Sequence, residues 1–199
     1  SVAVAEIIAP GVGYISLKQT RFSEDTAAEV EASLASLAER GLESLVLDLR
    51  GNPGGLLAQA TQVADLFLLK SDPIVTIRER RGLQSETRLS QRDPAVDIPL
   101  VVLIDGGSAS AAEIVAGAIQ DNDRGLVLGT PSFGKGSVQT IFDLGDAERG
   151  ALKLTTALYY TPSGRNIHKE LVASPSVLYE VVPLAGGELP AGLLLASIL

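Results

Sequence analysis

Two short apolar segments in this sequence each lead, through a loop with adjacent glycines, into a stretch of helical spacing. The first segment covers residues 45–49 and precedes helical spacing over residues 56–69. The second covers residues 100–104 and precedes helical spacing over residues 109–123. Strands this apolar are typical of sheets that are buried on both faces. The alternation therefore predicts an α/β fold whose sheet is covered on both faces.

The other periodic segments extend this pattern over most of the chain. Residues 23–40 have apolar positions at helical spacing and end before a glycine, which is typical of a helix. Residues 74–79 and 87–90 are predicted to form a hairpin around Gly82. Further strands are predicted over residues 12–17, 126–128, 138–142 and 152–160, with a turn over residues 145–150.

The composition narrows the classes of partner. The formal net charge is -8, from 16 Lys and Arg against 24 Asp and Glu. Nucleic-acid binding requires a basic surface, so we predict no nucleic-acid partner. The sequence contains no run of 18 apolar residues, so no segment is predicted to span a membrane. It contains no Cys for disulfide bonds, and without Met we expect a processed form or an excised piece of a longer chain.

Ser110 lies where a buried strand gives way to a helix. Backbone N–H groups at the start of a helix have no partner within it, so they can stabilise a developing negative charge. A serine at this point can present its oxygen while the N–H of Ala111 faces the oxyanion. Taken alone, this feature is explained better by an ordinary helix cap, and Ser108 is as good a cap.

Lys135 lies between Gly134 and Gly136. The two glycines allow the backbone to approach other groups closely. A lysine acts as a base near neutral pH only where its surroundings disfavour the charged form, and Phe133, Val138 and Ile141 could provide such surroundings. A surface lysine in a turn is the alternative.

The loop over residues 50–55 also leads directly into a helix. Gly54 or Gly55 can bring a backbone N–H close to a ligand. A tight turn between a strand and a helix would need glycine for its own reasons, so both interpretations stay open.

Two other catalytic patterns are incomplete. Residues 129–135 match the first seven positions of a phosphate-binding P-loop, but Gly136 replaces the required Ser or Thr. The following residues also favour a strand over the helix that a P-loop opens. His168 is the single histidine, and nothing in the sequence places it near a serine for a Ser–His–Asp triad.

Taken together and in this order, several segments resemble the carboxyl-terminal processing peptidases, also called tail-specific proteases. The resemblance covers residues 12–167, so we interpret residues 1–167 as a peptidase core. The assignment of residues 168–199 stays open. The matching segments are Gly13–Ile15 with Phe22, Leu47–Gly55, Ser108–Ala118, Ser132–Gln139 and Tyr159–Arg165.

The resemblance implies a serine endopeptidase with a Ser–Lys dyad that cleaves proteins near their C-terminus. Ser110 would be the nucleophile and Lys135 the general base. Gln139 would orient the lysine, which it would face from the same side of a strand. Oxyanion N–H groups would come from Ala111 and from Gly54 or Gly55. Asp121 matches an acidic position that we interpret as structural.

The resemblance also implies a fold, a location and partners. The fold would be a crotonase/ClpP-like core of repeated β-β-α units, and the mechanism would require no metal or other cofactor. Family members act mostly outside the cytoplasm and carry a substrate-binding PDZ domain before residue 12, which we expect to lie outside this chain. Proteins or peptides would be the substrates, and a homo-oligomer stays open. The alternative function is a peptide- or ligand-binding module that reuses the fold without catalysis.

Overall fold

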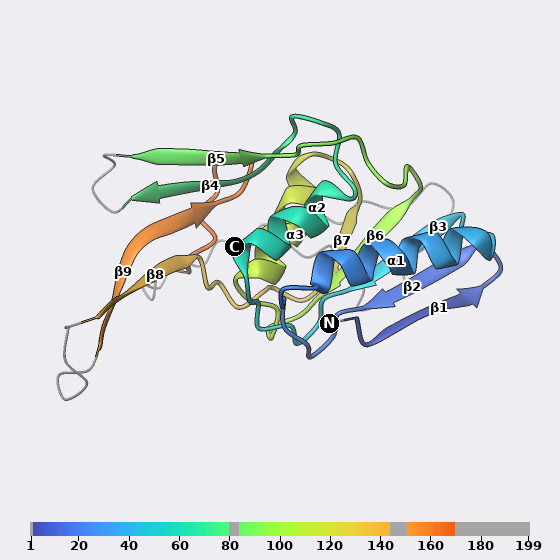
Figure 1. Ribbon diagram of the computed structural model, residues 1–199, viewed down its shortest axis with the longest axis horizontal. Helices are drawn as coiled ribbons and strands as arrows, with labels where there is room; N and C mark the ends of the chain where they lie inside the picture. The colour runs from blue at the N-terminus through green and yellow to red at the C-terminus, as the bar shows by residue number, and fades with distance from the viewer. Residues whose placement is uncertain (1, 80–83, 144–150, 170–199) are drawn as a thin grey trace.

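The computed structural model describes residues 2–79, 84–143 and 151–169. It is a mixed α/β structure, as the sequence predicts (Figure 1). The predicted turn over residues 145–150 and the segment 170–199 lie outside the described residues. In chain order the elements are β1 (Val4–Ala9), β2 (Val12–Ser16), α1 (Thr26–Glu39), β3 (Ser44–Asp48), α2 (Leu57–Asp65), β4 (Pro73–Glu79), β5 (Ser85–Leu89), β6 (Leu100–Ile104), α3 (Ala111–Asp121), β7 (Leu126–Gly129), β8 (Ser137–Asp143) and β9 (Ala151–Tyr160).

The first sheet has five strands in the order β1-β2-β3-β6-β7. Strands β2, β3, β6 and β7 are parallel, and β1 pairs antiparallel with β2. The sequence reasoning missed β1. Its residues are exposed or half-buried, because it is an edge strand, so it lacks the buried apolar run that identified β3 and β6.

In the described part of the chain, helices cover one face of this sheet. The prediction that both faces are covered is therefore wrong for these residues. The parallel strands β2, β3, β6 and β7 lie side by side in the sheet in the order in which they occur in the chain. Every crossover from one parallel strand to the next therefore runs in the same direction across the sheet. Right-handed crossovers then place α1, α2 and α3 on the same face. The burial pattern agrees, because Leu45, Leu47 and Val102 are fully buried, whereas Val46 and Leu103 on the other face are only partly buried.

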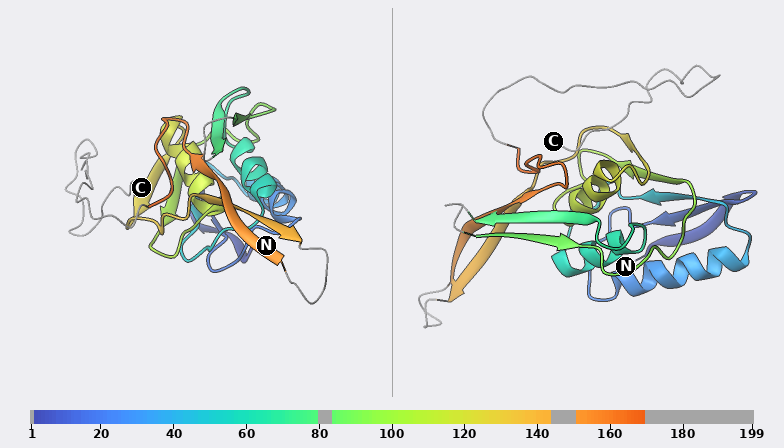
Figure 2. Two further views of the ribbon diagram at one scale, coloured as in Figure 1. Left: turned by 90° about the vertical axis from the view of Figure 1, so that its left-hand side faces the viewer. Right: turned by 90° about the horizontal axis from the view of Figure 1, so that it is seen from above.

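The second sheet is antiparallel and has the strand order β5-β4-β9-β8. The predicted pairing of the two hairpin strands is confirmed, with β4 and β5 as these strands, and Gly82 lies outside the described residues. Strand β4 packs against α2 and α3, so these helices lie between the two sheets, and the second sheet projects from the body (Figures 1 and 2). Among the described residues no helix is both long and apolar enough to cross a membrane.

Candidate active site

Ser110 occupies a strained turn between β6 and α3. Its φ is +54° and its ψ is -111°, a conformation that a residue with a side chain rarely adopts. Such strain costs on the order of 1–3 kcal/mol and persists where the surrounding structure enforces it, often at functional sites. Ser110 is half-buried and directly precedes Ala111, the first helical residue. The turn thus places the side chain beside the N-terminus of α3.

The two candidate serines have different environments. Ser108 is fully buried, and its hydroxyl donates to the carbonyl of Leu49 at 2.9 Å. The same hydroxyl accepts the N–H of Asp105 at 3.0 Å. These contacts join the loops after β3 and β6, so the Ser108 hydroxyl has a structural role. Ser110 is the more accessible of the two.

Glu113 joins the Ser110 turn to the Lys135 loop. Its side chain is fully buried on α3. One carboxylate oxygen accepts hydrogen bonds from the Ser132 hydroxyl at 2.7 Å and the Gly134 N–H at 2.6 Å. The other accepts the backbone N–H groups of Ser110 at 2.7 Å and Lys135 at 2.9 Å. A single carboxylate therefore fixes the positions of both segments relative to each other.

Sequence reasoning gave Glu113 no role, although a signal for it was present. Ser110 followed three residues later by Glu113 is the spacing of a capping box, in which the acid accepts the N–H of the cap residue. The structure contains that bond. Burial raises the pKa of the Glu113 carboxyl above its usual range, while its four hydrogen-bond donors counteract this shift.

The Lys135 loop packs against the segment that follows β9. The N–H of Lys169 donates to the carbonyl of Gly134 at 3.0 Å. A side chain at Gly136 would lie 2.2 Å from the backbone nitrogen of His168, so only glycine permits this contact. Sequence reasoning did not place His168, and the structure brings its backbone beside the loop of Lys135.

The side chain of Lys135 is exposed, and no described residue forms a hydrogen bond or ion pair with its amine. Gln139 is also exposed. The strand argument that would put both on one side does not hold here. Lys135 precedes β8, which begins at Ser137, and the pairing with β9 shifts register between Val138 and Gln139. Because Lys135 leads into a strand, the P-loop interpretation also lacks its helix.

The loop over residues 50–55 lies directly against the Ser110 turn. Gly54 is buried with φ +93°, and a side chain there would meet Ser110 Cβ at 2.8 Å and Ala111 N at 2.9 Å. The absence of a side chain at Gly54 therefore keeps this space open. The N–H of Gly54 donates to the Asn52 side chain at 2.9 Å, whereas Gly55 is exposed and forms a parallel bridge with Phe22.

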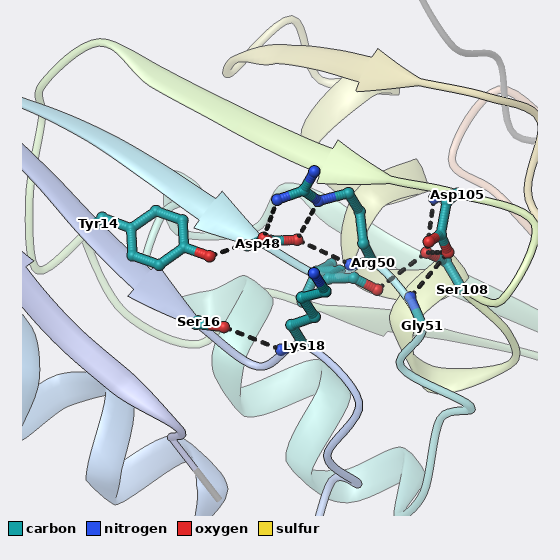
Figure 3. Close-up of polar contacts among 9 residues, drawn as sticks. Tyr14, Ser16, Lys18, Asp48, Arg50, Gly51, Asp105 and Ser108 are labelled. Carbon is teal, nitrogen blue, oxygen red and sulfur yellow. Dashed lines mark hydrogen bonds and ion pairs between the residues drawn. The ribbon is translucent and has the colours of Figure 1, made fainter.

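Asp105 holds the two glycine-containing loops together (Figure 3). Its carboxylate accepts the N–H groups of Gly51 at 2.7 Å and Gly107 at 2.9 Å. Gly51 belongs to the loop after β3, and Gly107 belongs to the loop after β6. Asp105 therefore holds the loop of Gly54 and the loop of Ser110 in a fixed position relative to each other. Sequence reasoning assigned Asp105 no function.

An ion pair between a buried aspartate and a half-exposed arginine supports the same edge of the sheet. Asp48, at the end of β3, accepts two side-chain hydrogen bonds from Arg50 at 2.9 and 2.6 Å and one from the Tyr14 hydroxyl at 2.7 Å (Figure 3). Burial alone would raise the pKa of Asp48, but these bonds and the Arg50 charge hold that pKa below its usual value. The network fixes the backbone where the glycine loop begins.

Asp121 has a comparable role at the other end of α3. It accepts the N–H of Ser163 at 3.0 Å and its hydroxyl at 2.7 Å, and it pairs with Arg165. Burial opposes ionisation, yet hydrogen bonds and the Arg165 charge hold the pKa of Asp121 below its usual value. These contacts tie α3 to the turn after β9, in agreement with the structural role expected for this residue.

The comparisons with known proteins identify the family. Residues 11–176 match the model of peptidase family S41, so the chain belongs to this family. The carboxy-terminal-processing protease of Bartonella bacilliformis is 48% identical over 176 residues, which are 85% of this chain and 39% of that protein. The chloroplastic carboxyl-terminal-processing peptidase 3 of Arabidopsis thaliana is 38% identical over 161 residues, 81% of this chain and 30% of that protein.

A solved structure supports the same assignment. The photosystem II D1 C-terminal processing protease superposes with a TM-score of 0.67 and 34% identity, over 79% of this chain and 39% of that one. The chain thus spans about two fifths or less of each of these three relatives. The matched part includes every residue of the candidate site described above.

Proposed function

We propose that this chain is the catalytic core of a serine endopeptidase that uses Ser110 and Lys135 and cleaves proteins near their C-terminus. Family S41 and the protease names of the relatives support a serine-type peptidase. The observation that carries the assignment of residues is the Glu113 carboxylate. It binds the backbone of Ser110 and of Lys135 at once, which fixes the two proposed partners relative to each other.

The proposed mechanism is acyl transfer from the peptide to water. The neutral amine of Lys135 takes the proton from the Ser110 hydroxyl as its oxygen attacks the substrate carbonyl carbon. The oxyanion that forms is stabilised by the N–H of Ala111 and by an N–H from Gly54 or Gly55. The lysine ammonium then gives its proton to the leaving amine, and an acyl-enzyme remains.

Hydrolysis of the acyl-enzyme completes the cycle. Lys135 takes a proton from water, which attacks the ester carbonyl, and the proton returns to Ser110 as the second product leaves. Gln139 orients Lys135 during both steps. Gly55 is the more accessible of the two oxyanion glycines, because the N–H of Gly54 would first have to leave Asn52.

The wider setting is part of the same proposal. We infer a crotonase/ClpP-like core over residues 1–167, which the succession of β1, β2 and α1 supports as one β-β-α unit. We also infer that a PDZ domain serves this core in the whole protein. The chloroplastic relative supports action outside the cytoplasm.

Labelling with a fluorophosphonate, which reacts with activated serines, tests the proposal. We expect one labelled residue, Ser110, and loss of both labelling and peptide hydrolysis in Ser110→Ala. Ser108→Ala is the comparison, since its hydroxyl is buried and structural. Labelling of another serine would refute the assignment, and a folded chain that binds peptide without labelling would favour the binding module.

A further inference from the structure

A groove of about 770 Å³ lies between α2 and β5. Strand β5 contributes four successive residues to the lining of the groove, Glu86–Leu89. Successive strand residues point to opposite faces, so a groove lined by four in a row runs along the edge of the strand. From α2, one face of the helix contributes Leu57, Ala58, Thr61, Gln62 and Asp65.

Strand β5 is an edge strand of the second sheet, and all five of its residues are exposed. The N–H of Glu79 donates to the carbonyl of Gln84, which makes this a hydrogen-bonded pair. Because such pairs alternate along an antiparallel ladder, the N–H and C=O groups of Thr87 point outward from the sheet. The hydroxyls of Thr76 and Thr87 are 2.9 Å apart, as expected for the closer, non-hydrogen-bonded type of pair.

One end of α2 brings the groove close in sequence to the candidate active site. The lining residue Leu57 is two residues from Gly55, the proposed oxyanion glycine. At the other end, Asp65 accepts the Ser90 hydroxyl and the Gln91 N–H, both at 2.6 Å, so α2 and β5 are joined there. A chain that lies in the groove along α2 would pass the start of this helix, which follows the loop of Gly54 and Gly55.

The groove lacks a strong charge of either sign. Glu86 and Arg88 form an ion pair with each other at 3.1 Å, and Asp65 faces Arg92 at 3.5 Å. Leu57 and Leu89 add apolar surface, and 43% of Leu89 is exposed. These surroundings suit an uncharged extended chain that is held through its backbone.

We propose that the groove binds an extended segment of the polypeptide substrate, which adds as a further strand to the edge of β5 that no described strand pairs with. The inference rests on the proposed peptidase function. Backbone pairing supplies affinity with little dependence on sequence, and the apolar side chains favour uncharged residues. Five residues at about 3.4 Å each would span the length of β5.

Peptide binding to the chain in a Ser110→Ala background tests this without catalysis. The probe is an uncharged decapeptide of alanine and valine that carries fluorescein, and binding is followed by fluorescence anisotropy. Thr87→Pro removes the outward N–H and is tolerated at a strand edge, whereas Thr87→Val keeps it. We expect about five- to tenfold weaker binding for Thr87→Pro and unchanged binding for Thr87→Val. Equal binding by both variants would overturn the proposal.

Two further measurements separate the remaining outcomes. Decapeptides N-methylated at single positions should lose affinity at every second position, which needs no variant of the chain, and loss without this alternation would contradict strand addition. If sedimentation shows self-association that Thr87→Pro abolishes, β5 pairs with a second copy and the substrate assignment is wrong. Peptide hydrolysis that survives Ser110→Ala would refute the proposed function. The anisotropy comparison of Thr87→Pro with Thr87→Val tests the groove alone.

Discussion

Replacing Glu113 with Gln tests how the site is held together. The amide nitrogen cannot accept a hydrogen bond, and its least costly place is beside Ser132, whose hydroxyl can accept instead of donate. The N–H of Gly134 then lacks an acceptor, which costs about 1–3 kcal/mol of unfolding free energy. Because Gly134 precedes Lys135 directly, we also expect kcat for a peptide substrate to fall by about 100-fold.

The effect of this substitution on stability should depend on pH in a definite direction. Burial raises the pKa of Glu113 in the folded state, so its contribution to stability is full below 4.5 and is lost as pH rises through the folded value. Gln does not titrate. The advantage of the wild type over Glu113→Gln should therefore be largest near pH 4 and smaller at pH 8.

Urea unfolding at the two pH values measures this difference, because other titrating groups are common to both proteins. Glu24→Gln is the control, since Glu24 is exposed, and we expect neither its stability nor its kcat to change. An advantage that grows from pH 4 to pH 8 would refute the reasoning. It would show that the four hydrogen bonds outweigh burial and that the fold prefers the ionised carboxylate.

Three other predictions concern single positions. Gln139→Ala should lower kcat more than it raises KM, and an unchanged kcat would remove Gln139 from the site. The pKa of Asp48 is lowered by its partners despite burial, so the stability it contributes is present above pH 3.8 and is lost as pH falls through the folded value. Urea unfolding of Asp48→Asn should therefore converge on the wild type in acid. Gly54→Ala should abolish peptide hydrolysis, because its Cβ would lie 2.7–2.9 Å from atoms of the Ser110 turn, whereas Gly41→Ala, with a similar φ of +82° and open space, should retain it.

The parts of the fold that sequence predicts best are those with a strong apolar period. Strands β3 and β6 and the helices that follow them appear where the buried runs place them. Strand β1 was missed because an exposed edge strand has no such run. The cover of the sheet was also predicted wrongly, since strand composition reports burial but does not report the direction of the crossovers.

In the candidate site too, the residues that leave a local pattern in the sequence could be predicted, and those that act through distant contacts could not. Ser110 could be singled out because it lies at a strand-to-helix turn and within a segment that resembles the family, and its role as nucleophile stays a prediction. Asp105 and Glu113 act through backbone groups far away in sequence, such as the Gly51 N–H and the Lys135 N–H, and a sequence does not record such partners. The roles of Lys135 and Gln139 stay predictions, because both side chains are exposed in the structure.

The position of Glu113 also bears on how a lysine could serve as the base here. A carboxylate beside the amine would favour the ammonium form, which cannot accept a proton. Glu113 is bonded to the backbone of Lys135, but its two oxygens already accept four hydrogen bonds, about as many as a carboxylate can take. None of the four donors is the amine, and no described carboxylate pairs with it. An acid can thus hold the lysine loop through main-chain N–H groups without pairing with the amine, which is what the proposed Ser–Lys mechanism requires.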